Sequence, residues 1–117
     1  MKILNSDARK KRRRLRRTEE LAVKLGNLQF LGILEPDKLL EDAFRKQLGR
    51  DRNAGESIFD YGAQALGIPV LGVRALVTAV MAGADPVSFG LAESAETYHA
   101  VVLLYLSMGK ESPALKN

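Results

Sequence analysis

The residues best suited to chemistry in this sequence are the guanidinium and ammonium groups of residues 9–17, which read RKKRRRLRR. Six arginines and two lysines surround a single leucine there. The excess of arginine favours forked contacts with phosphate oxygens, because a planar guanidinium offers two donors to one phosphate. The run holds no aromatic residue, so stacking of bases on it is not predicted. The candidate phosphate-binding residues are Arg9, Lys10, Lys11, Arg12, Arg13, Arg14, Arg16 and Arg17.

The charge of the chain is divided unevenly between this run and the rest. Residues 1–17 hold nine Lys and Arg against one acid, a net charge of +8, whereas residues 18–117 hold nine bases against thirteen acids, a net charge of −4. The sequence therefore predicts a basic arm (1–17), a helical domain (18–109) and a C-terminal tail (110–117). Contact with nucleic-acid phosphates is the leading interpretation of the arm. The alternatives are a solvated charge run that pairs with the acidic body, an anionic membrane, or an acidic protein partner.

As a helix, the arm would repel itself. Like charges four residues apart, such as Arg9 and Arg13 or Arg12 and Arg16, destabilise a helix by roughly a few tenths of a kcal/mol per pair. We therefore expect the isolated arm to fray, and a polyanion to order it by neutralising its charge. Contacts with phosphate alone carry no sequence information, so the arm by itself predicts binding without sequence preference.

Catalytic and metal chemistry finds little support in the remaining residues. Cysteine is absent, which excludes a disulfide framework, a thiolate zinc site and a thiol nucleophile, and fits a reducing compartment. The single histidine, His99, follows Glu96 with the i, i+3 spacing of carboxylate-bridged metal bundles. Such a site needs a second copy of the pair, which neither Asp60 nor Glu93 supplies, so a solvated or hydrogen-bonded His99 is expected. The sequence predicts no enzyme activity, no cofactor and no metal.

The positions of proline, glycine and capping residues predict an all-α fold, a single compact domain of about five helices that carries the basic arm. The helices are expected over residues 6–25, 36–48, 57–66, 69–83 and 85–108. The first is expected to stop at Gly26 and Asn27, and the last either runs unbroken or pauses near Ser94. The fourth is almost wholly apolar and is therefore expected to be the most enclosed. Residues 27–34 fit a helical turn, a strand or a connector.

Three glycines, Gly62, Gly72 and Gly90, fall inside the expected helices, where each costs roughly 0.5–1 kcal/mol relative to alanine. Such residues often let another backbone come close, so we expect the last three helices to pack tightly. The alternative is that some of these glycines mark kinks or breaks.

The spacing of residues 59–78 (FDYGAQALGIPVLGVRALVT) resembles the helix-turn-helix motif. Gly67 stands at the turn of that motif, where a residue tolerant of positive φ is needed. In this alignment Arg74 and Thr78 point outward on the second helix and are the candidates to contact DNA bases. The other outward positions are mostly aliphatic, which departs from a base-reading helix. A structural helical hairpin is therefore the alternative.

No membrane span and no secretion signal are predicted. The most apolar stretch, residues 68–84, has seventeen residues and is interrupted by Arg74, whereas a span needs about 20 apolar residues. The basic N-terminus is not followed by the apolar stretch of a signal peptide. A cytoplasmic location is therefore expected.

Together these features predict a small DNA-binding protein that acts in transcription regulation or as an accessory factor, with DNA favoured over RNA. The arm would contact phosphates, and the helical body would form a homodimer or dock a protein partner. Val70 and Leu71, aliphatic and outward-facing in the helix-turn-helix alignment, are the expected interface residues. The alternative is a helical protein-interaction adaptor or small chaperone with no specific nucleic-acid role.

Overall fold

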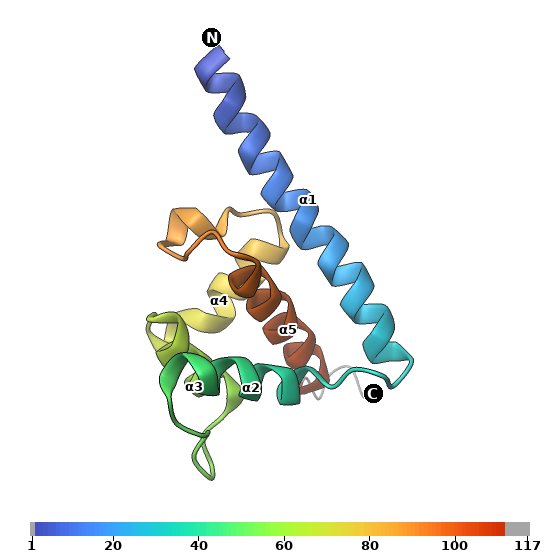
Figure 1. The fold of residues 1–117 in the computed structure, drawn as a ribbon, viewed down its shortest axis with the longest axis vertical. Helices are drawn as coiled ribbons and strands as arrows, with labels where there is room; N and C mark the ends of the chain where they lie inside the picture. The colour runs from blue at the N-terminus through green and yellow to red at the C-terminus, as the bar shows by residue number, and fades with distance from the viewer. Residues whose placement is uncertain (1, 112–117) are drawn as a thin grey trace.

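The computed structural model describes the backbone of residues 2–111 and the side chains of residues 8–109, Lys11 excepted. This part of the chain forms five α-helices and one short 3-10 helix, with no strand among the described residues (Figure 1). The elements are α1 (Lys2–Phe30), α2 (Pro36–Leu48), α3 (Ile58–Leu66), α4 (Val70–Met81), η1 (Pro86–Phe89) and α5 (Ala95–Glu111). The predicted all-α, single-domain fold is confirmed. The expected tail (110–117) lies outside the described residues from position 112 onward.

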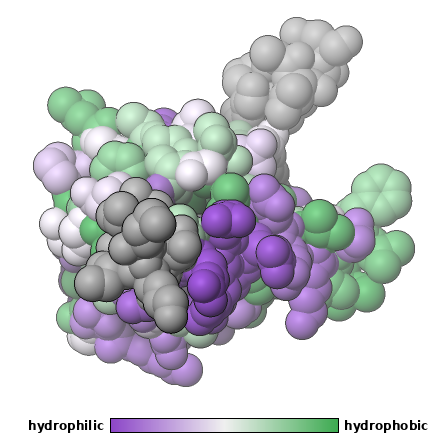
Figure 2. All heavy atoms as spheres, turned by 90° about the horizontal axis from the view of Figure 1, so that it is seen from above, coloured by the Kyte–Doolittle hydropathy of each residue, from purple (hydrophilic) through white to green (hydrophobic). Residues whose placement is uncertain are grey.

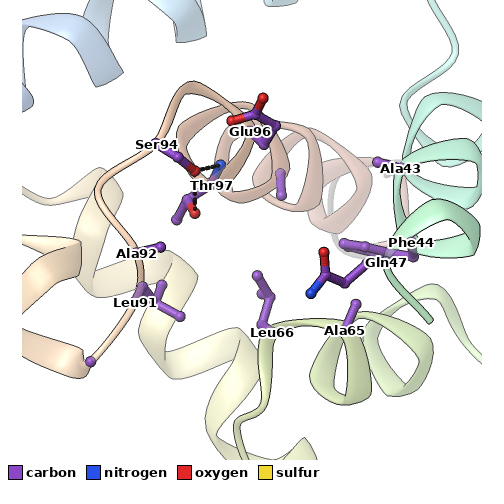
Figure 3. A pocket seen from close by; sticks show the side chains of 12 residues that line it. Ala43, Phe44, Gln47, Ala65, Leu66, Leu91, Ala92, Ser94, Glu96 and Thr97 are labelled. Carbon is purple, nitrogen blue, oxygen red and sulfur yellow. Dashed lines mark hydrogen bonds between the residues drawn. The ribbon is translucent and has the colours of Figure 1, made fainter.

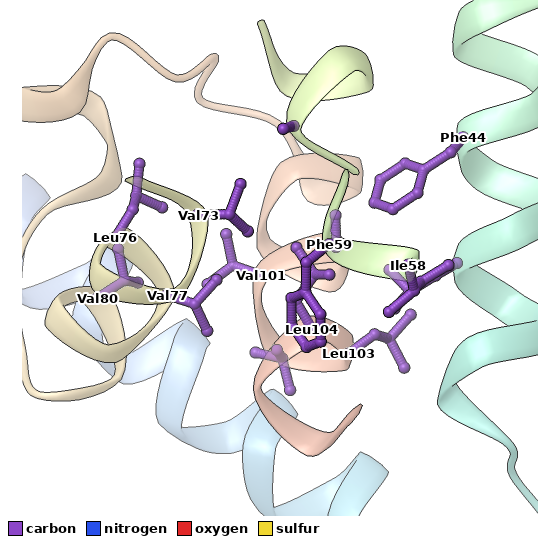
Figure 4. Close-up of a cluster of buried hydrophobic side chains, with 14 of the residues drawn as sticks. Phe44, Ile58, Phe59, Val73, Leu76, Val77, Val80, Val101, Leu103 and Leu104 are labelled. Carbon is purple, nitrogen blue, oxygen red and sulfur yellow. The ribbon is translucent and has the colours of Figure 1, made fainter. Parts of the chain in front are cut away.

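The centre of the fold is α5. Its residues Tyr98, Val101, Val102 and Leu104 are inaccessible to solvent, because α1, α2 and α4 each pack against it (Figure 1). The helix α3 joins the core by packing between α2 and α4, where Phe59 contributes to the cluster of buried side chains in Figure 4. Four elements therefore share one apolar core that is built around the last helix.

The expectation that the fourth helix is the most enclosed is wrong. One side of α4 packs into the core through Val73, Val77 and Val80, which are buried. The opposite side holds Leu71, whose side chain is 95% exposed, and Val70, which is half exposed. An apolar composition all round α4 therefore does not correspond to burial all round, because only one face of α4 meets other helices.

Local capping signals set most of the helix starts. Ser57 accepts a hydrogen bond from the Asp60 N–H at 3.0 Å, and α3 begins directly after it, as predicted. Asp85 caps η1 rather than a long helix, and the Ser94 hydroxyl accepts from the Thr97 N–H at 3.1 Å where α5 begins. The second alternative for the last helix, a pause near Ser94 followed by a restart, is thus confirmed.

The first helix is longer than expected, and the predicted stop at Gly26 and Asn27 is wrong. α1 continues to Phe30, and a left-handed residue, Gly32 (φ +76°), follows in the turn. A Cβ added at Gly26 would lie 3.9 Å from Leu106 of α5, so the helix passes this glycine while packed on α5. Tertiary packing outweighs the cost of one helical glycine. Residues 27–34 are therefore the last helical turn followed by a connector.

The three internal glycines have different roles. At Gly62 an added Cβ would lie 3.0 Å from the Phe44 ring of α2, so a side chain comes close there and not the backbone that was expected. Gly90 ends η1 with φ +84°, which is the alternative, a break. A Cβ at Gly72 would meet nothing within 4 Å, so packing inside the described chain does not require a glycine there.

The loop between α2 and α3 is held by one arginine. Arg50 donates to both carboxylate oxygens of Glu56, at 3.0 and 2.9 Å, and to the Gln64 side chain at 2.7 Å. Its backbone carbonyl accepts a hydrogen bond from the buried Tyr61 hydroxyl. The pKa of Glu56 lies below its ordinary value, chiefly because of the hydrogen bonds from Arg50.

We expect Glu56→Gln to lower the urea midpoint of unfolding at pH 7 and to have a much smaller effect at pH 3. A carboxyl group whose pKa is lowered by folding stabilises the fold above its unfolded pKa, and this contribution is lost as the pH falls through the folded pKa. Glu35→Gln, in the exposed Glu35–Lys38 pair, is the control that should change neither midpoint. An equal decrease of the urea midpoint at pH 7 and pH 3 in Glu56→Gln would show that the charge of Glu56 is not what stabilises the fold.

Candidate nucleic-acid interface

One side of the basic arm is packed against the body. Thr18 is buried, and its hydroxyl donates to the Arg14 carbonyl oxygen at 2.9 Å. One turn earlier, the Leu15 side chain approaches Gly83, where an added Cβ would lie 3.9 Å from Leu15 Cδ1. These contacts set the rotation of α1 about its own axis and therefore decide which arm residues face solvent.

Arg14 fastens this side of α1 to the body. Its Nε and Nη2 donate to the two carboxylate oxygens of Asp85 at 2.8 and 2.6 Å, and Nη1 lies 3.4 Å from Glu93. The Arg14 side chain is only 11% exposed. Its pKa is raised, chiefly by the hydrogen bond to Asp85. Among the predicted phosphate ligands, Arg14 is thus directed at two carboxylates of its own chain.

Arg17 lies over a buried ring. Its guanidinium carbon is 5.3 Å from the ring centroid of Tyr98, while the Arg17 side chain stays exposed. The Tyr98 hydroxyl is buried and has no hydrogen-bond partner within the described chain. Burial, followed by the charge of Glu93, raises the pKa of Tyr98. Tyr98 therefore stays neutral and presents an electron-rich face to Arg17.

The remaining arginines of the arm form one continuous surface. At about 100° per residue they share an outward arc of about 140°, opposite the side that carries Arg14 and Thr18. We call this surface the arginine face; it consists of Arg9, Arg12, Arg13, Arg16 and Arg17, all exposed. Within the described side chains, none of the five forms a salt bridge. Lys10 is exposed on the flank of this face, and the side chain of Lys11 lies outside the described residues.

The arm extends from the body as a helix. Figure 1 shows the first half of α1 projecting past the other helices, and Leu15 and Arg14 mark where it leaves them. Viewed from that end, strongly hydrophilic residues gather over this part of the surface (Figure 2). The helix therefore presents guanidinium groups on a support that is already anchored.

The second predicted contact surface, on α4, is also exposed. Arg74, Thr78, Val70 and Leu71 all face solvent, and the Arg74 guanidinium carbon lies 4.0 Å from the ring centroid of Phe59. α3 and α4 meet at a bend of 86°, close to the range of about 90–120° in helix-turn-helix motifs. α1 packs chiefly against α5 and approaches the end of α4 near Gly83, two residues after α4 ends.

An apolar surface that the sequence did not predict lies at the turn between α1 and α2. Phe30 is 90% exposed, and Leu31, Ile33, Val23 and Leu39 are also exposed around it. We call these five residues the α1–α2 corner, which is visible as the hydrophobic edge in Figure 2. A groove of about 390 Å³, lined in part by Ile33 and Leu39, lies beside it. The only signal in the sequence was the apolar run within residues 27–34.

The places considered for catalysis or metal binding hold ordinary contacts. His99 is exposed, and its Nδ1 lies 3.1 Å from the Ala95 carbonyl oxygen, so the expected hydrogen-bonded histidine is confirmed. No group of three or more His, Asp or Glu side chains in the described part of the chain is placed to hold a metal ion. A groove of about 380 Å³ between α2, α3 and the start of α5 has a largely apolar lining (Figure 3). The hydroxyls of Ser94 and Thr97 at its edge bond to each other at 3.0 Å.

Taken one at a time, the described helices are too short or too polar to cross a bilayer. By length and composition alone, α3 and α4 would be long and apolar enough together, but they are bent by 86°. No protein-family model, curated protein or solved structure matches this chain.

We expect Asp85→Asn to loosen the base of the arm. The amide still offers an oxygen to the Val87 N–H, but the charge that holds Arg14 is gone, which we expect to destabilise the fold by about 1–2 kcal/mol. Amide hydrogen exchange over residues 8–18 should become faster, and urea unfolding measures the stability loss. Glu35→Gln removes an equal charge from an exposed pair and should leave both unchanged. Unaltered exchange in Asp85→Asn would show that the ion pair does not hold the arm.

Proposed function

We propose that this protein binds nucleic acid, duplex DNA in preference to RNA, by placing the arginine face of α1 against backbone phosphates. The observation that carries the proposal is that five arginines lie on one solvent-facing arc of a projecting helix, while Arg14 on the opposite side is held by carboxylates. Each guanidinium brings a fork of donors that matches phosphate oxygens. Neutralising the like charges would also remove the repulsion within the arm.

The shape of the arm favours DNA over RNA. An α-helix is about 10–12 Å wide with its side chains, and the major groove of B-DNA, about 12 Å wide, admits it. The major groove of A-form RNA is too deep and narrow for that. Phosphate contacts supply affinity without sequence preference, which suits an accessory or regulatory factor. Arg74 and Thr78, both exposed on α4, are the residues proposed to contact bases if the protein also reads sequence.

A second candidate function, a protein-interaction module, is favoured by the α1–α2 corner. Five apolar side chains are exposed there, and two of them, Ile33 and Leu39, also line a groove. In a twofold dimer the same patch of a second copy would cover these side chains. Arg17, the arginine of the face nearest to Phe30 along α1, is about 20 Å of helical rise from it, about two screening lengths, so repulsion between the charged arms is largely screened at the corner. We therefore propose that a second copy of this chain covers the corner.

We expect the double variant Arg12→Gln/Arg16→Gln to weaken binding to a fluorescent duplex. The slope of log K against log salt should become shallower by about two, because each lost phosphate contact removes about 0.9 from it. Lys38→Gln/Lys46→Gln removes the same charge from exposed positions on α2 and should change the slope far less. Equal losses in both variants, or binding to phosphatidylserine vesicles but not to duplex DNA, would overturn the proposal. Tighter binding to duplex RNA than to DNA would overturn the preference for DNA.

For the second candidate, we expect sedimentation equilibrium to show a homodimer that Phe30→Ser/Ile33→Ser dissociates without loss of helicity, because both side chains already face solvent in the monomer. Leu71→Ser is the matched control for the exposed surface of α4 and should leave the dimer intact. A monomeric wild-type chain would rule out pairing through the corner. A dimer lost only in Leu71→Ser would move the interface to α4, where the sequence placed it.

A further inference from the structure

The line of cations on α1 does not stop at the end of the arm. Lys10, Arg13, Arg17 and Lys24 are all exposed, and at about 100° per residue they lie within about 60° of one another. They therefore form one stripe along a flank of the helix. An acid follows the arginines on both sides, Glu20 beside the stripe and Glu19 on the other flank. Only the stripe continues to a further cation, Lys24.

The stripe leads into a groove between α1 and the beginning of α5. This groove, of about 270 Å³, is lined on the α1 side by Arg17, Glu20, Leu21 and Lys24. From α5 it receives Ala95 and His99. Two cations, an imidazole and the Glu20 carboxylate thus surround a small concave surface. The Arg17 guanidinium at its edge is positioned over the Tyr98 ring.

His99 can donate to an anion in this groove only as an imidazolium cation. Its Nδ1 lies 3.1 Å from the Ala95 carbonyl oxygen, which can only accept, so Nδ1 carries the ring proton. Nε2 then donates to a ligand only when the ring is protonated, that is, as a cation. The charged groups around the groove are Arg17, Glu20 and Lys24 from α1, with Glu96 one turn earlier on α5. The groove also lies at the N-terminal end of α5, where the helix dipole favours negative charge.

We infer that this groove binds a backbone phosphate of the nucleic acid, so that the contact runs from the arm onto the body along Lys10, Arg13, Arg17, Lys24 and His99. The inference rests on the proposed function. It adds the path of the nucleic-acid backbone along α1 and a phosphate site on the body. Lys10 and Lys24 are about 21 Å apart along the helix axis, a length of about six base-pair steps at 3.4 Å each.

Glu20 is the opposing charge in this groove and gives the sharpest test. Removing it by Glu20→Gln should tighten binding of a 20-base-pair duplex, measured by anisotropy at about 0.1 M salt. Glu19→Gln makes the same change of net charge on the flank without the stripe and should alter the affinity less than twofold. If Glu19→Gln tightens binding as much as Glu20→Gln, overall charge explains the result and the groove site is overturned.

Lys24→Gln should weaken binding about five- to tenfold at 0.1 M salt and make the salt slope shallower by about 0.9, the values for one phosphate contact. Lys38→Gln on α2 is the control of equal charge.

The outcomes separate this inference from the function on which it rests. If Lys24→Gln matches Lys38→Gln while Arg12→Gln/Arg16→Gln loses affinity, the groove site is overturned and binding by the arm stands. If neither the groove nor the arm variants change the affinity, both the inference and the proposed function fail. Circular dichroism should show no loss of helicity in any variant, since all these side chains are exposed.

Discussion

The ion pair between Arg14 and Asp85 is the interaction on which the arrangement of the functional surfaces depends. Asp85 also caps η1 through the Val87 N–H, so one carboxylate joins the arm to η1. Because both side chains are largely removed from water, salt screens their attraction less than it screens the exposed arginines. Arg14 faces inward for this reason, and the spacing of the α-helix then turns the five remaining described arginines outward.

The parts of the fold that sequence reasoning predicted are those fixed by local interactions. Ser57 caps α3 and Gly67 ends it, and both signals lie within one helical turn of the residues that they organise. The basic composition of the arm was equally visible. The sequence did not show which side of the arm packs against the body, because that depends on the pairing of Arg14 with Asp85, 71 positions away in the sequence. The same holds for Gly26, whose place inside α1 depends on packing against the distant α5.

Burial was harder to predict than secondary structure. The apolar composition of α4 suggested enclosure, yet Leu71 is almost fully exposed, whereas α5, with more polar residues at its ends, forms the centre. How deeply a helix is buried depends on how many other helices surround it, and three helices pack on α5. A chain of this length leaves part of its apolar surface uncovered, and here that part is concentrated at the α1–α2 corner and on α4. The spacing of apolar residues in a sequence identifies the apolar face of a helix, but it does not show which element covers that face.

The continuity of α1 through Gly26 has a mechanical consequence. A helix without a break fixes both the separation and the relative azimuth of its ends, and α1 carries the arginine face near one end and the corner at the other. The two surfaces cannot approach each other or rotate independently unless the helix bends. A molecule bound at Phe30 therefore lies about 32 Å along the axis of α1 from a molecule bound at Arg9. A helix that stopped at Gly26 would have made this spacing adjustable.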